Sequence, residues 1–222
     1  MDHSRIQLQH SYVTVNADAG RVTHGGDQAW LSSEAARSFG CGLIAAADIL
    51  RYLRKDTGHE LSKARYLEEI AVIQKDFPVK SSLGITGFGL ARRMNRMFRR
   101  EGLPFRARWG MSRRRLESRI REMLSADIPV LLSVGPCFRH KKERLPLYHR
   151  KTEGKYEKSS GMRDHYVTVT GWEQDPGEES GMMEISSWGE KYYVNYAEYE
   201  AFVKKNDNFL FSNILYIRRK AE

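Results

Sequence analysis

The sequence predicts an α+β protein that folds as a single domain over residues 1–222. Most segments with apolar residues at helical spacing lie within residues 1–127, and most segments with strand spacing lie within residues 128–222. The two kinds of element are therefore segregated along the chain, unlike the alternation of a βαβ protein. With 41% hydrophobic residues, the chain can also bury one substantial core.

The first part of the chain is expected to be mainly helical. The stretch "SYVTVN" at 11–16 alternates like a strand, and the glycine-rich "SSLGITGFG" at 81–89 is a loop without the ending of a phosphate-binding loop. Ser112 is a suitable N-cap for the last of the helices. The helices are expected at 41–54, 62–76, 88–101 and 112–126.

The second part is expected to be mainly β. Residues 138–163 are polar and basic and are expected to be an insertion without regular structure, and a short helix is expected at 197–204. The strands are expected at 128–135, 165–172, 182–188, 191–196 and 209–219.

Positive charge is concentrated in one segment. The chain has a net charge of +9, and residues 92–121 contain 12 arginines but only two acidic residues. Such a segment can attract an anionic partner, or it can be the solvated face of two helices. Nucleic acid is not expected as the partner, because no nucleic-acid-binding motif accompanies the arginines.

Several features favour a cytoplasmic protein. No apolar run approaches the roughly 18–20 residues of a membrane span, and the N-terminus lacks the layout of a signal peptide. Two cysteines, Cys41 and Cys137, cannot form a disulfide framework. With His140 and His149, Cys137 would supply only three metal ligands among repelling lysines and arginines, so we expect no metal and no organic cofactor.

Two residues have the character of a thiol-based catalytic pair. Cys41 lies between Gly40 and Gly42 at the start of an alanine-rich helix, where backbone N–H groups favour a thiolate and can hold an oxyanion. The glycines leave the thiol reachable. His165 opens the strand "HYVTVTGW", where it would be well positioned as a base. Each residue also has a structural interpretation, as a small helix-start residue and as a core histidine.

The order of these motifs resembles the papain-like cysteine peptidases. A Cys-Gly helix start is followed by "IPVLLSV", then "HYVTVTG", then a strand that ends in "SSWG". The resemblance covers roughly residues 30–215 and is greatest to the bacterial bacteriocin-processing (double-glycine leader) peptidases and their stand-alone relatives. It implies Cys41 as the nucleophile, His165 as the general base and acid, and Trp188 as a shield over the histidine's hydrogen bond.

The sequence departs from this family at two positions. Ser186 stands where the family has Asn or Asp to orient the imidazole, and Glu184, on the same strand face, is an alternative. Ala35 stands where the family has its oxyanion-hole glutamine, so Gln28 would serve only if the intervening segment folds back.

The resemblance implies a cysteine peptidase or other thiol hydrolase that cleaves a peptide or isopeptide amide of a peptide or protein substrate. A transferase or deamidase would use the same thioester. The two departures leave a different class open, namely a catalytically silent papain-like module that binds a peptide or an anionic partner.

Overall fold

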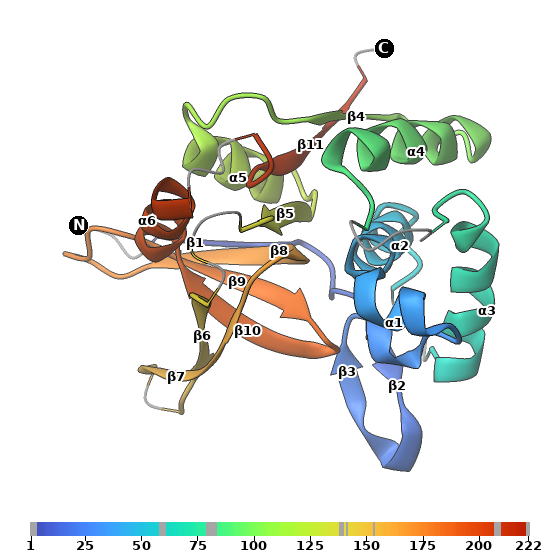
Figure 1. Cartoon of the computed structure of the whole chain (residues 1–222), viewed down its shortest axis with the longest axis horizontal. Coiled ribbons are helices and arrows are strands. Elements are labelled where there is room, and N and C mark those ends of the chain that lie inside the picture. Colours follow the sequence, from blue (N-terminus) through green and yellow to red (C-terminus); the bar gives the residue numbers. More distant parts are fainter. Residues whose placement is uncertain are drawn as a thin grey trace.

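The computed structural model describes residues 4–57, 61–78, 84–137, 140, 142–152, 154–206 and 210–220. The fold is α+β, with one large sheet whose strand pairs are all antiparallel (Figure 1). Helices α1 to α4 gather at one end of the molecule and α6 lies at the other. None of the helices in the described ranges has the length and hydropathy needed to cross a membrane.

The sheet has β8 (His165–Gln174) near its centre. One edge of β8 pairs with β5 and then with β1, and the other edge pairs with β9. The order across the sheet is β4 (Phe105–Trp109), β11 (Ile214–Arg219), β5 (Val130–Val134), β8, β9 (Met182–Ser187), β10 (Glu190–Asn195), β6 (Leu145–Arg150) and β7 (Tyr156–Met162), with β1 (Ser4–Gln7) beside β8. The sheet therefore takes strands from both parts of the chain.

Four of the described helices begin within one residue of their predicted starts, and a further helix, Glu34–Phe39, was not predicted. Ser33, Ser62 and Thr86 each cap a helix by accepting a backbone N–H bond, which satisfies an otherwise unpaired donor. The helices are α1 (Glu34–Phe39), α2 (Cys41–Leu53), α3 (Lys63–Gln74), α4 (Gly87–Arg100), α5 (Leu116–Ser125) and α6 (Tyr196–Asn206). A hairpin of β2 (Thr14–Asn16) and β3 (Val22–His24) and two short 3₁₀ turns, at Asp18–Gly20 and Gln28–Trp30, complete the described elements.

The helix α2 is the central helix, as its apolar sequence predicts. Every residue after Cys41 in α2 is buried, so the helix has no solvated face. It packs on β8, where a Cβ atom added to Gly42 would be 3.1 Å from the Tyr166 ring. This contact brings the first turn of α2 against the beginning of β8.

Three sequence-based expectations are wrong. Residues 138–163 contain the strands β6 and β7, because Leu145 and Leu147 point into the core while the basic residues face outward. Ser112 bonds to the N–H of Arg114, and α5 begins only at Leu116, after the left-handed Arg115. The last strand begins at Ile214 instead of 209.

The arginine-rich segment spans α4, β4 and α5. In α4 a buried apolar stripe faces the core, and the arginines between its members point outward. In α5 the periodicity predicts such a stripe, and its four apolar residues, Leu116, Ile120, Met123 and Leu124, are buried. The strand β4 adds Arg106 and Arg108 to the outer surface, in strict alternation with buried Phe105, Ala107 and Trp109.

Candidate active site

Cys41 is the first residue of α2, at a sharp junction with α1. Gly40 ends α1 and caps α2, and a side chain there would collide with the Ala36 carbonyl. The two glycines expected to expose the thiol therefore also have packing reasons, since Gly42 lies close to Tyr166. The junction leaves Cys41 half-buried and places it on a cavity wall.

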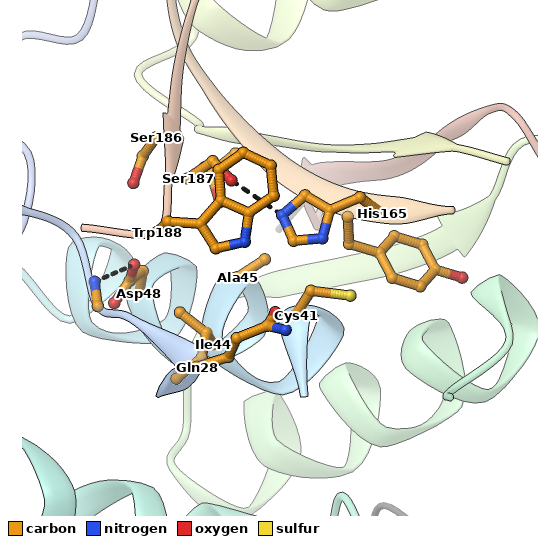
Figure 2. Close-up of a pocket in the computed structure, with 12 residues that line it drawn as sticks. Gln28, Cys41, Ile44, Ala45, Asp48, His165, Ser186, Ser187 and Trp188 are labelled. Carbon is orange, nitrogen blue, oxygen red and sulfur yellow. Dashed lines mark hydrogen bonds between the residues drawn. The ribbon is translucent and has the colours of Figure 1, made fainter. Parts of the chain in front are cut away.

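His165 is the first residue of β8 and is held on two sides. Its Nε2 atom lies 2.8 Å from the Ser187 hydroxyl, and the Trp188 ring stacks on the imidazole with centroids 4.5 Å apart and planes inclined by 19°. The other ring nitrogen, Nδ1, is on the side where Cys41 lies (Figure 2). When the ring proton is on Nε2, this N–H donates a hydrogen bond to the Ser187 hydroxyl. The Nδ1 atom then keeps a lone pair that can accept the proton of the Cys41 thiol.

The serine that contacts the histidine is Ser187, whereas the resemblance implied Ser186. The Ser186 hydroxyl donates to the His24 carbonyl at 2.7 Å, away from the imidazole. Successive strand residues face opposite sides, so only one of the two serines can meet His165. The β8–β9 pairing shifts register between Val169 and Gly171, and this shift determines which of the two serines faces His165. The sequence alone does not predict such a shift.

The alternative orienting residue, Glu184, is also occupied elsewhere. It accepts from the Thr170 hydroxyl at 2.9 Å and pairs with the Lys191 ammonium at 3.0 Å. Lys191 and these hydrogen bonds hold the pKa of the Glu184 carboxyl below its usual value, against the effect of burial. Glu184 therefore belongs to a polar cluster between strands.

Burial acts on both members of the candidate pair. It raises the pKa of the Cys41 thiol, although the backbone N–H groups of Tyr166, Gly42 and Cys41 oppose the increase. It also lowers the pKa of His165 to about 4. Each group thus favours its neutral form near pH 7, so the thiol keeps its proton until His165 accepts it during attack.

Gln28 reaches the site because the chain folds back. The segment between Gln28 and Cys41 passes through a 3₁₀ turn and α1, and both residues line one narrow cavity with His165 and Ser187 (Figure 2). The Gln28 amide nitrogen donates to the Arg37 carbonyl at 2.7 Å. The cavity, of about 20 Å³, has room for roughly one water molecule.

A wider groove lies beside the pair. It measures about 520 Å³, and its lining includes Cys41, His165, Phe39, Tyr166 and Cys137. The volume is enough for side chains of a bound peptide. Asp164 also lines this groove, and its carboxylate accepts the Cys137 N–H at 2.6 Å, which holds the groove wall immediately before His165.

Comparisons of the chain with protein-family models, with characterised proteins and with solved structures found no match. Any assignment of function depends on the geometry described above.

Proposed function

We propose that the protein is a thiol hydrolase of the papain-like class that cleaves a peptide or isopeptide amide. One observation carries this proposal: an imidazole bracketed by the Ser187 hydroxyl and the Trp188 ring lines the same cavity as a cysteine at the N-terminus of a buried helix. A nucleophile, a base and a group that orients the base are the parts that thiol catalysis needs. The helix-on-antiparallel-sheet arrangement of α2 and β8 supports a papain-like fold.

In the proposed reaction, the Cys41 sulfur attacks the amide carbonyl carbon while His165 Nδ1 takes the thiol proton. The Cys41 N–H and the Gln28 amide stabilise the resulting oxyanion. His165 then returns the proton to the leaving nitrogen as the C–N bond breaks, which leaves a thioester on Cys41. Water attacks this thioester with His165 again as base, and the carboxylic acid and the free thiol are released.

Because the thiol must remain reduced, we also place the protein in a reducing compartment such as the cytoplasm. Both cysteines are free in the structure. Cys137 is buried, and burial and the nearby Asp164 raise the pKa of its thiol to about 11. Cys137 is therefore a poor competitor for thiol reagents near neutral pH.

The proposal is tested by acylation with p-nitrophenyl acetate in a Cys137→Ser background. We expect a burst of nearly one nitrophenolate per protein that is lost in Cys41→Ser. His165→Ala should slow it by about 100- to 10,000-fold, the range of general-base catalysis. His10→Ala, an exposed histidine bonded to Asp127, is the matched control. A burst that survives in Cys41→Ser, or equal rates in His165→Ala, contradicts the proposal.

A second candidate function, binding of an acidic peptide, is favoured by one surface feature. Arg106 of β4 lies directly opposite Arg218 of β11, and like charges in this position repel. The next pair joins Arg108 to Tyr216, whose hydroxyl donates to the Glu122 carboxylate at 3.0 Å. Within the described residues, no carboxylate forms an ion pair with Arg106, Arg108 or Arg218.

For this surface we expect a fluorescent oligoglutamate peptide to bind more tightly at about 50 mM than at about 300 mM NaCl, because salt screens exposed charges. The double variant Arg106→Gln/Arg218→Gln should weaken binding, whereas Arg65→Gln on α3 should not. Equal binding by both variants would contradict the assignment of the acidic peptide to this surface.

A further inference from the structure

The mechanism proposed above gives no role to the buried carboxylate of Asp48. Asp48 is only 1% exposed and lies on α2. Its Oδ2 atom accepts the Gly26 N–H at 3.0 Å, and its Oδ1 atom accepts the Tyr66 hydroxyl at 2.8 Å. Burial raises the pKa of Asp48 to about 6, although the hydrogen bonds from Gly26 and Tyr66 oppose the increase. A carboxylate is costly to bury, so its place beside the candidate site requires a reason.

The segment that Asp48 contacts leads directly to Gln28. Gly25 has a φ of 80°, and a Cβ atom there would be 2.6 Å from the Asp48 Oδ2 atom. A Cβ atom on Gly26 would collide with the Tyr66 hydroxyl. The two glycines therefore permit the backbone to approach Asp48 more closely than other residues would.

The same segment is also bound by the end of β9 and the turn that follows it. The Ser186 hydroxyl donates to the His24 carbonyl, and the Gly189 N–H donates to the Gly26 carbonyl at 3.1 Å. The His24 N–H in turn donates to the Gly189 carbonyl at 2.9 Å. Residues 24–26 are therefore hydrogen-bonded both to Asp48 of α2 and to the end of β9 with the turn that carries Trp188.

Asp48 and Cys41 share one rigid element. They are seven residues apart on α2, which is two helical turns, or about 10 Å, along one face. Both line the narrow cavity that Gln28 also lines, and Figure 2 draws the Asp48 bond to the Gly26 backbone at the far end of it. One helix therefore holds the nucleophile and the anchor of the loop that brings the second oxyanion donor.

We propose that Asp48 is a positioning residue that, through Gly26, sets the position of Gln28 relative to the Cys41 N–H and so forms the oxyanion site. This inference rests on the proposed function, because it assumes an acyl-transfer reaction at Cys41. In this proposal Gly25, Gly26, Ser186 and Asp48 all act to position the backbone that leads to Gln28.

The test compares two reactions of Cys41 in the Cys137→Ser background. Acylation by p-nitrophenyl acetate passes through a tetrahedral oxyanion, whereas alkylation by iodoacetamide displaces iodide and forms none. Gln28→Ala should lower the ratio of the acylation to the alkylation rate by about 100-fold, the lower end for loss of one oxyanion donor. Asp48→Asn should lower this ratio at least tenfold, and the double variant should be no worse than Gln28→Ala, since both act on one donor.

Two further variants separate positioning from stability. Tyr66→Phe removes the Tyr66 hydrogen bond to Asp48 but leaves those from Gly26 and Tyr12, so it should lower the melting temperature without changing the ratio. Ser186→Ala releases the loop from its β9 side and should lower the ratio while Asp48 remains, which keeps the test valid if Asp48→Asn does not fold.

The outcomes are distinct. A wild type without a Cys41-dependent burst overturns the proposed function and this inference with it. An intact burst, with an unchanged ratio in Asp48→Asn or with effects of Asp48→Asn and Gln28→Ala that multiply, overturns the role of Asp48 alone. Where Asp48→Asn does not fold, an unchanged ratio in Ser186→Ala overturns it.

Discussion

At the scale of single residues, the candidate site depends on two unusual backbone conformations. Asp164, just before His165, has a φ of 51°, and Trp188, just after Ser187, has the same value. The left-handed region is rarely occupied by residues other than glycine and is especially unfavourable for a bulky one. At Trp188 this conformation accompanies stacking of the indole on the imidazole, so local strain coincides with the organisation of the site.

The two adjacent serines should separate the base from the oxyanion site. Ser187→Ala removes the hydrogen bond to His165 and should slow both acylation and alkylation of Cys41, by about tenfold, the equivalent of one net hydrogen bond. Ser186→Ala should slow acylation alone, because its partner is the His24 carbonyl. Stopped-flow rates with both reagents provide the measurement, and the reverse pattern would contradict the assignment of Ser187.

At the scale of elements, the β6–β7 hairpin extends the sheet beyond β10. Tyr193 of β10 pairs with Tyr148 of β6, and β7 forms the outer edge of the sheet order. The exposed pattern of β7, with charges at Glu157 and Lys158, suits an edge strand because charges discourage pairing with another chain. The polar sequence of residues 138–163 is therefore compatible with the strands β6 and β7, because these strands lie at the edge of the sheet.

If the hairpin belongs to the core, shortening one of its inward side chains should destabilise the protein. Leu147 is fully buried, and Leu147→Ala should lower the free energy of unfolding by about 2–5 kcal/mol. Lys158→Ala, on the exposed side of the same hairpin, should change it by less than about 0.5 kcal/mol. Urea denaturation measures both values, and a Leu147→Ala variant as stable as the wild type would place the hairpin outside the core.

At the scale of the whole molecule, the buried His165 and the half-buried His24 link stability to pH. Burial lowers the pKa of His165 to about 4, and burial with the nearby Lys191 does the same for His24. Both values lie below the unfolded pKa of about 6.5, so the unfolded state binds more protons between pH 6.5 and pH 4. The stabilising contribution is therefore present above pH 6.5 and is lost as the pH falls toward 4. Asp48 acts in the opposite direction, because its pKa is raised.

We expect the free energy of unfolding to decrease between pH 7 and pH 5, by roughly 2 kcal/mol for each histidine before the smaller opposing effect of Asp48. His24→Gln should reduce this pH dependence, since it removes one titrating group. Urea unfolding at the two pH values provides the measurement. A wild type that is equally stable at both, or a His24→Gln variant with an unchanged loss, would argue against buried neutral histidines.

The sequence by itself determined the features that depend on local periodicity. The start of α2 at Cys41, the apolar stripe of α5 and the strands from β8 to β10 follow from the spacing of apolar residues within one element. The same local patterns singled out Cys41 and His165, which the structure brings together. Leu145 and Leu147 also alternate, but the pattern is short and the surrounding charges concealed it.

Only the tertiary structure decided which partners those residues meet. The choice of Ser187 over Ser186 depends on a register shift between two strands, and the approach of Gln28 depends on a chain reversal. The role proposed for Asp48 could not be predicted from the residues around it in the sequence. It depends on the hydrogen bond from the Gly26 N–H, which comes from a distant part of the chain. Strand register and loop closure arise from contacts between residues far apart in the chain, and periodicity within one element does not contain them.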